Sequence, residues 1–194
     1  MTGDRSSSAA GSGAPASSSG QRRGLAALLA RRRVALGFLL AVIVLWLANP
    51  TMMSLAIGGA IALAGEAVRI WAAGHVEKSR EVTRSGPYRW TRHPLYLGSS
   101  IIGAGIAVAA ANWLIAVLVF GYLGSTISSA IRVEEAHLRE KFGGAYDAYA
   151  AQMAPPMQRS FSAARALANR EHHAVAGLLL ALALLALKVG LSIR

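Results

Sequence analysis

The sequence predicts an all-α integral membrane protein with about five transmembrane helices. The 194-residue chain is 54% hydrophobic and 15% charged, whereas soluble domains average about 25% charged residues. Its apolar residues gather in long segments. Two polar loops concentrate charge and aromatic side chains beside such segments, and polar groups there are costly to keep unless they bind something.

The N-terminal region precedes these segments. Residues 1–20 are mostly Ser, Gly and Ala, which bury too little surface to fold, so we expect a disordered tail. Residues 21–33 carry five arginines around a short apolar patch and are typical of a basic juxtamembrane segment on lipid headgroups. A signal peptide is the rival interpretation, but more apolar segments follow at once without a clean small-residue cleavage site.

Five apolar helices are predicted in the rest of the chain. They cover residues 34–48, 51 to about 64, 94–111, 113 to about 131, and 174–193. Asn49-Pro50 and Asn112 give tight turns between neighbouring helices. The first two segments are short for a span of about 20 residues, so we expect the second helix to continue through Trp71 and expect snorkelling arginines or local thinning of the bilayer.

Small residues at four-residue spacing indicate where these helices approach one another. One row is Ser99, Gly103, Ala107 and Ala111, and another is Ala56, Ala60 and Ala64. We assign both rows to helix packing, because close association in lipid depends on small side chains.

Lysine and arginine mark the cytoplasmic side. The connections around Pro50 and Asn112 contain neither residue, whereas the N-terminal tail, residues 74–93 and residues 132–170 hold nearly all of them. The positive-inside rule therefore places the N-terminus and both polar loops in the cytoplasm. The excess of 20 Lys and Arg over 9 Asp and Glu indicates anionic lipid rather than nucleic acid as a partner in so apolar a chain. Because cysteine is absent, disulfides, thiolate metal sites and cysteine nucleophiles are excluded, and we expect no metal.

The first polar motif is GPYRWTRHPLYLG at residues 86–98. His93 precedes a proline and is disfavoured from helical conformation, so Pro94 is well placed as the first residue of the third helix. The free N–H groups and positive dipole end of that helix attract a carboxylate or phosphate. Two arginines add positive charge and three aromatic rings offer faces: Arg89, Arg92, Tyr88, Trp90 and Tyr96. An interfacial belt of aromatic and basic residues is the alternative.

The second polar motif is EEAHLREKFGGAYDAY at residues 134–149. The adjacent carboxylates Glu134 and Glu135 are unexpected near the C-terminus of a helix, which is itself negative. If the fourth helix continues, Glu134 and Leu138 share a face, with Phe142 one turn further on. A solvated helix with Glu–Arg pairs is the alternative.

Together the two motifs supply donors for a carboxylate, carboxylates for a cation, and aromatic faces. This set matches S-adenosylmethionine, which carries an α-carboxylate, an α-ammonium and a sulfonium next to an adenine. A carboxylate near a sulfonium gains Coulomb energy, and aromatic faces add cation–π attraction. No GxGxxG fingerprint follows a strand, so the pocket differs from the doubly wound dinucleotide sites.

This pair of motifs resembles the signature of the isoprenylcysteine carboxyl methyltransferase family, integral-membrane enzymes related to phospholipid methyltransferases. The resemblance covers about residues 69–159 of a membrane domain at residues 34–194. It implies a methyltransferase whose C-terminal half encloses S-adenosylmethionine at the cytosolic face. The implied cofactor contacts are Arg80, Glu81, Val82, Thr83, Tyr88, His93, Pro94, Leu95, Tyr96 and Glu134.

The resemblance also bears on the methyl acceptor. We expect a lipophilic acceptor that enters between helices, either a carboxylate such as an isoprenylcysteine-type group or a lipid amine. Where the family pattern has a substrate-binding arginine, four residues before Glu134, this chain has Ala130. We therefore expect Arg132 to substitute, with Arg92 as a second substrate contact. A carboxylate needs no general base, whereas an amine or hydroxyl does, and the candidate bases are His93, Glu135 and His137.

Two rival functions stay open at this point. Membrane sterol-type reductases carry a similar segment with arginine and proline, and they bind NADPH at the cytosolic face. The other rival is a non-catalytic membrane scaffold that retains a degenerate motif. Binding of S-adenosylhomocysteine, of NADPH or of neither distinguishes the three functions.

Overall fold

The structure, a computed structural model, describes residues 35–78 and 80–192. The described part is all helical and contains no strand. Its helices are Ala35–Leu47, α2 (Met52–Ala73), the short 3-10 helix η1 (Gly86–Arg89), α3 (Pro94–Ala110), α4 (Trp113–Phe142), α5 (Gly144–Ala150), α6 (Ala163–Ala168) and α7 (Glu171–Ser192). The predicted disordered tail and basic juxtamembrane segment lie outside the described residues.

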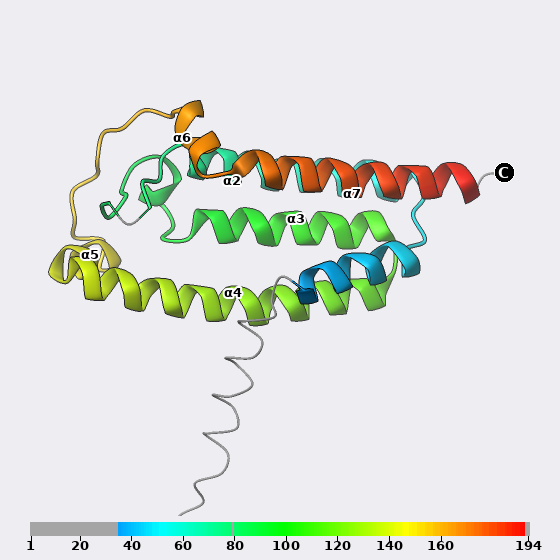
Figure 1. Cartoon of the computed structure of the whole chain (residues 1–194), viewed down its shortest axis with the longest axis horizontal. Coiled ribbons are helices and arrows are strands. Elements are labelled where there is room, and N and C mark those ends of the chain that lie inside the picture. Colours follow the sequence, from blue (N-terminus) through cyan, green and yellow to red (C-terminus); the bar gives the residue numbers. More distant parts are fainter. Residues whose placement is uncertain (1–34, 79, 193–194) are drawn as a thin grey trace, which may run out of the picture.

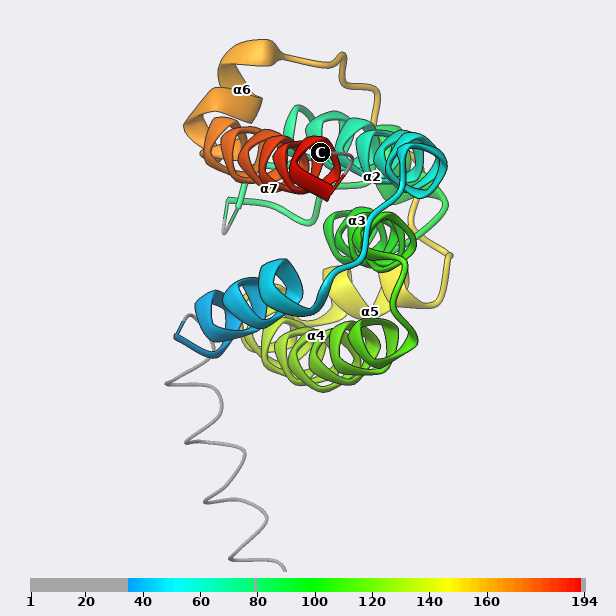
Figure 2. The same cartoon turned by 90° about the vertical axis from the view of Figure 1, so that its right-hand side faces the viewer.

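The long helices lie side by side in layers (Figures 1 and 2). α2 and α7 form one layer, α3 lies next to them, and α4 lies on the other side of α3. The helix Ala35–Leu47 joins this bundle through Val44, which belongs to one buried apolar cluster with Ile115, Val119 and Leu185. The core therefore connects the first described helix to α4 and α7.

Three helices, α2, α4 and α7, are long and apolar enough to cross a membrane, and Ala35–Leu47 and α3 are shorter apolar helices. The predicted continuation of the second helix through Trp71 is confirmed, since α2 has 22 residues and ends at Ala73. α4 has 30 residues, a length of about 45 Å. Because the hydrocarbon core is about 30 Å thick, a span needs only about two thirds of α4, and the charged residues from Glu134 to Lys141 lie in its C-terminal third.

The two ends of the bundle carry different elements. One end carries α5, α6 and the loop after α2, and the other carries two short turns and the end of α7 (Figure 1). Both predicted turns are present and are tied together, because the Asn49 N–H donates to the Ala110 carbonyl at 2.8 Å. The Asn112 side chain likewise donates to the Leu47 carbonyl at 2.9 Å. Both polar motifs therefore lie at the same end.

α2 and α3 pack backbone against backbone. A Cβ added to Gly65 would lie 2.7 Å from the Ile102 nitrogen and 2.8 Å from the Gly98 oxygen. Gly58 and Gly105 face the opposite helix at similarly short range. Glycine is required at these positions because any side chain would push the two helices apart.

The predicted small-residue rows agree with this packing only in part. The row Ala56, Ala60 and Ala64 is wrong, because all three side chains are exposed. The contact row of α2 is shifted to buried residues, Gly58, Ala62 and Gly65. On α3 the prediction holds for Gly103 and Ala107, which are buried, and Gly103 faces the Leu123 side chain of α4.

Candidate active site

A cavity of about 930 Å³ lies at the charged end of the bundle. Its walls come from α2, α3 and α7, from α4 and α5, and from the loop at residues 76–83. It also reaches Leu36 and Tyr122, which belong to apolar helices. A volume of this size lies within the usual range of ligand sites, about 300–1,000 Å³. The cavity is therefore lined by both polar and apolar side chains.

Most of the residues proposed from sequence line this cavity. They are Glu81, Val82, Thr83, Tyr88, Arg92, His93, Pro94, Leu95, Tyr96, Glu134 and His137. Three others do not line it. Arg80 and Arg132 are exposed elsewhere on the surface, and Glu135 contacts His93 instead.

The first motif forms a short turn followed by a helix start. Gly86 has a φ of +55°, and a Cβ there would lie 2.6 Å from the His75 ring, so only glycine fits this turn. Pro94 is the first residue of α3, and His93 before it has a non-helical backbone, as the sequence predicted. This geometry points the free N–H groups at the start of α3 toward the charged end of the bundle.

Glu135 anchors the first motif to α4. Its Oε1 atom lies 3.1 Å from Nε2 of His93 and 3.1 Å from Nη1 of Arg92, and its Oε2 atom lies 3.9 Å from Nη1 of Arg139. The hydrogen bond with His93, together with the charges of Arg92 and Arg139, holds the pKa of Glu135 below its ordinary value. The carboxylate therefore stays ionised and fixes the orientation of the His93 ring.

Glu134 faces the cavity, whereas its neighbour Glu135 does not line it. Glu134 lines the cavity together with Leu138, so the predicted shared face of α4 is confirmed for these two residues. Phe142 does not line the cavity. Glu134 forms no hydrogen bond or ion pair with any residue in the described part of the chain. Its carboxylate is therefore available to a cation in the cavity.

Tyrosines close one side of the cavity. Tyr149 on α5 donates a hydrogen bond of 2.9 Å to the Tyr88 carbonyl and so joins α5 to η1. Burial raises the pKa of Tyr149 to about 12. Burial, with the neighbouring Glu134 carboxylate, also raises the pKa of Tyr88. Both phenols stay neutral at physiological pH and present aromatic faces rather than negative charge.

One ion pair on the cavity wall was not predicted from the sequence. Arg69 of α2 donates from Nε to Oε1 of Glu171, the first residue of α7, at 2.6 Å. Arg69, Ser99 and Glu171 all line the cavity, and Glu171 is only 6% exposed. The available signal was a charged residue at the end of each apolar segment, but a single sequence does not show which charges meet.

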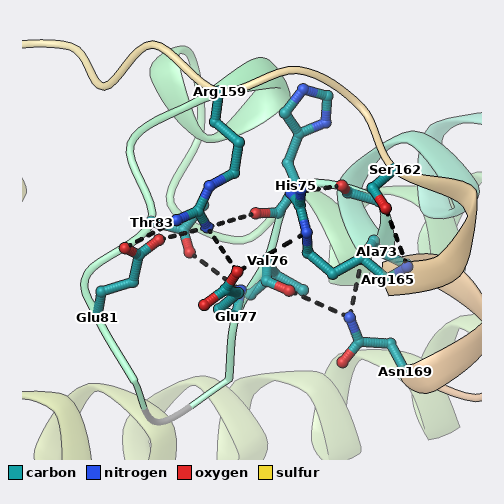
Figure 3. Close-up of polar contacts among 11 residues, drawn as sticks. Ala73, His75, Val76, Glu77, Glu81, Thr83, Arg159, Ser162, Arg165 and Asn169 are labelled. Carbon is teal, nitrogen blue, oxygen red and sulfur yellow. Dashed lines mark hydrogen bonds and ion pairs between the residues drawn. The ribbon is translucent and has the colours of Figure 1, made fainter.

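A second missed group lies behind the loop that follows α2. Arg159, 78 residues downstream of Glu81, donates from Nη2 to Oε2 of Glu81 at 3.0 Å (Figure 3). Arg159 also donates to the His75 carbonyl at 3.3 Å. It does not line the 930 Å³ cavity itself. The chain after residue 150 thus supports a loop that contributes six residues to the cavity wall, three of which are Glu81, Val82 and Thr83.

Potential metal ligands do not gather at the site. Within residues 35–78 and 80–192, no three His, Asp or Glu side chains form a group that could hold a metal ion.

Comparison with known families agrees with the geometry. The phospholipid methyltransferase family model matches residues 32–145, more than half of the chain. This range contains the first motif and most of the second, and it ends before the segment that carries Arg159. No curated protein and no solved structure matches the chain significantly. With its helices long enough to cross a membrane, the chain belongs to the phospholipid methyltransferase family of membrane methyltransferases.

Proposed function

We propose that this protein transfers a methyl group from S-adenosylmethionine to a lipophilic acceptor bound in the 930 Å³ cavity. The observation that carries the proposal is that both motifs face one cavity with an unpartnered carboxylate. Glu134 stands among aromatic side chains on that wall, with Tyr88 and Tyr96 also lining it. Such a set suits a sulfonium or ammonium cation.

The residues present fit the proposed methyl donor. Glu134 would hold its positive end, and the N–H groups of Leu95 and Tyr96, at the start of the 17-residue helix α3, would attract its carboxylate. Glu81, Val82 and Thr83 would complete the wall. When bound, S-adenosylmethionine supplies an electrophilic methyl group. The protein contributes by placing the acceptor in line with that methyl and by excluding water.

The His93–Glu135 pair favours a lipid amine as acceptor. An amine must lose a proton in order to attack, and a base oriented by a carboxylate is the usual arrangement for that task. Because Nε2 of His93 is bound to Glu135, Nδ1 is the nitrogen left to accept the proton. His137 also lines the cavity but has no carboxylate partner in the described part of the chain.

A lipophilic carboxylate is the second acceptor class. Arg92 lines the cavity and would pair with such a group, although it already contacts Glu135. Arg132, the substitute expected from sequence, is exposed and does not line the cavity. We therefore assign the amine as the preferred acceptor.

Ligand-dependent thermal unfolding in detergent tests the donor. We expect S-adenosylmethionine to raise the unfolding temperature and NADPH to leave it unchanged. Glu134→Gln should abolish the rise, because the neutral side chain no longer attracts a cation. Glu140→Gln is the matched control, since Glu140 is an exposed carboxylate of α4 that does not line the cavity. Stabilisation by NADPH alone would support a reductase, and stabilisation by neither would support a scaffold.

We also propose that the charged end faces the cytoplasm. The support is the positive-inside rule together with the placement of both polar motifs at that end. The chain has no cysteine, so single cysteines can be introduced at exposed Ala111 and Ala151. In intact cells an impermeant maleimide should label Ala111→Cys and spare Ala151→Cys. The opposite pattern would reverse the topology.

A further inference from the structure

In the loop between α2 and η1, the described residues 74–78 and 80–85 form no helix or strand. The loop nevertheless contributes Glu81, Val82 and Thr83 to the cavity wall. Its own polar contacts are long. The Glu77 N–H donates to Oγ1 of Thr83 at 3.4 Å, and the Arg80 N–H donates to the Glu77 carbonyl at 3.3 Å. Hydrogen bonds of that length are weak. The position of the loop therefore depends on contacts from outside it.

Arg159 supplies the contacts to the carboxylates of the loop that are shortest. Its Nη2 atom donates a hydrogen bond to Oε2 of Glu81, and its Nη1 atom forms an ion pair with Oε1 of the same carboxylate (Figure 3). It also lies 3.6 Å from Oε1 of Glu77. The Arg159 and Glu81 side chains are only 19% and 27% exposed, so solvent screens this pair less than a surface ion pair. Because one hydrogen bond and one ion-pair contact reach the two carboxylate oxygens, they hold the direction of the Glu81 side chain as well as its position.

The segment that carries Arg159 is itself anchored to the end of α2. Arg165 donates from Nη1 to the Gly74 carbonyl at 2.9 Å, and the Ser162 N–H donates to the same oxygen at 3.1 Å. Asn169 donates from Nδ2 to the Ala73 carbonyl at 2.9 Å and to the Val76 carbonyl at 3.1 Å (Figure 3). These bonds satisfy carbonyls that the end of a helix leaves free. The segment that carries Arg159 is therefore held in place against the C-terminal end of α2.

We propose that Arg159 is a positioning residue for the methyl-donor site, which acts by holding the Glu81–Thr83 wall through its hydrogen bond and ion pair with Glu81. The proposal rests on the proposed function, because it takes those three residues to be part of the donor pocket. Arg159 does not line the cavity and lies beyond the matched family region, residues 32–145. The C-terminal segment thus completes the site from outside the motifs.

Hydrogen–deuterium exchange of the ligand-free protein tests the positioning without any donor. In Arg159→Ala we expect faster exchange in residues 75–84 and unchanged exchange in α3 and α4, because opening is local where contacts are few. Arg159→Lys keeps the charge but has one nitrogen in place of the two that contact Glu81, so its exchange should be intermediate. Lys141→Ala is the control, since Lys141 is exposed on α4 and does not line the cavity. Unchanged exchange at residues 75–84, or faster exchange over the whole bundle, would overturn the proposal.

Affinity for S-adenosylhomocysteine tests the consequence for the site. A charge-assisted hydrogen bond that holds a binding site in place stabilises the complex enough that its loss weakens affinity for S-adenosylhomocysteine about tenfold. We expect that loss in Arg159→Ala and a similar loss in Glu81→Gln, with no further loss in the double variant, because one interaction is removed in each case. Additive losses, or an Arg159→Ala affinity within twofold of the unmodified protein, would refute the coupling.

The two measurements separate the two proposals. If the unmodified protein does not bind S-adenosylhomocysteine, the proposed function fails, whatever the exchange data show. If it binds and Arg159→Ala changes neither affinity nor local exchange, the positioning proposal fails and the proposed function stands.

Discussion

Replacing Gly65 by alanine is expected to separate the two helices that frame the cavity. A Cβ at Gly65 would lie 2.7 Å from the Ile102 nitrogen and 2.8 Å from the Gly98 oxygen. Backbone atoms cannot rotate away as side chains do. Ordinary contact begins at 3.4 Å, so α2 and α3 must move apart locally by about 0.7 Å.

The cost follows from overpacking, which destabilises proteins by about 1–3 kcal/mol. For a chain of this size, 1 kcal/mol corresponds to about 2–4 °C in unfolding temperature, so we expect Gly65→Ala to lower it by about 2–12 °C. Tryptophan fluorescence during heating in detergent measures the change. Donor affinity should fall as well, because α2 carries Arg69 and α3 begins at Pro94, both on the cavity wall.

Gly121→Ala is the matched control on α4. A Cβ at Gly121 meets nothing within 4 Å, and alanine favours the helix over glycine by up to about 1 kcal/mol. The control should therefore unfold at the same temperature as the unmodified protein or slightly higher. If Gly65→Ala and Gly121→Ala behave alike, the close packing of α2 on α3 is refuted.

Two further changes test the contacts around the cavity. Glu135→Gln removes an ionised partner of His93. The pKa of Glu135 is lowered in the folded protein. The stabilisation that the Glu135 carboxylate gives is therefore present above the ordinary carboxyl pKa and is lost as the pH falls through the folded-state pKa. The unfolding temperatures of Glu135→Gln and the unmodified protein should thus differ at pH 7 and converge in acid; a difference that persists in acid contradicts the ionic role. Tyr149→Phe removes the 2.9 Å bond to the Tyr88 carbonyl and should cost about 1 kcal/mol, and an alkaline absorbance titration should lose the tyrosine that ionises near pH 12. Loss of a tyrosine that ionises near pH 10 instead would contradict the burial of Tyr149.

Local signals in the sequence predicted the helices well. Pro94 and Asn112 mark helix starts because their side chains act on the adjacent backbone, and both appear where expected. The continuation of α4 past Glu134 follows from a four-residue pattern within a single helix. Such features depend on neighbours in the chain, so a single sequence contains them.

Contacts between distant segments could not be predicted in the same way. The rows containing Ala60 and Gly58 are both rich in small residues, and only the packing of α2 on α3 shows that the second faces inward. Glu134 and Glu135 are adjacent, but the position of His93 decides which of them faces the cavity. The Arg159 contact spans 78 residues, and no local pattern marks it.

Methyl transfer in isolated membranes tests the central claim most directly. Membranes that contain the protein are incubated with S-adenosylmethionine labelled on its methyl group, and lipids are then extracted. We predict label in the lipid fraction for the unmodified protein and for Glu140→Gln, and a loss of at least about tenfold for Glu134→Gln, because the cation loses its carboxylate partner. Label found only in water-soluble products, or equal lipid labelling in all three proteins, would contradict a membrane methyltransferase that works through this cavity.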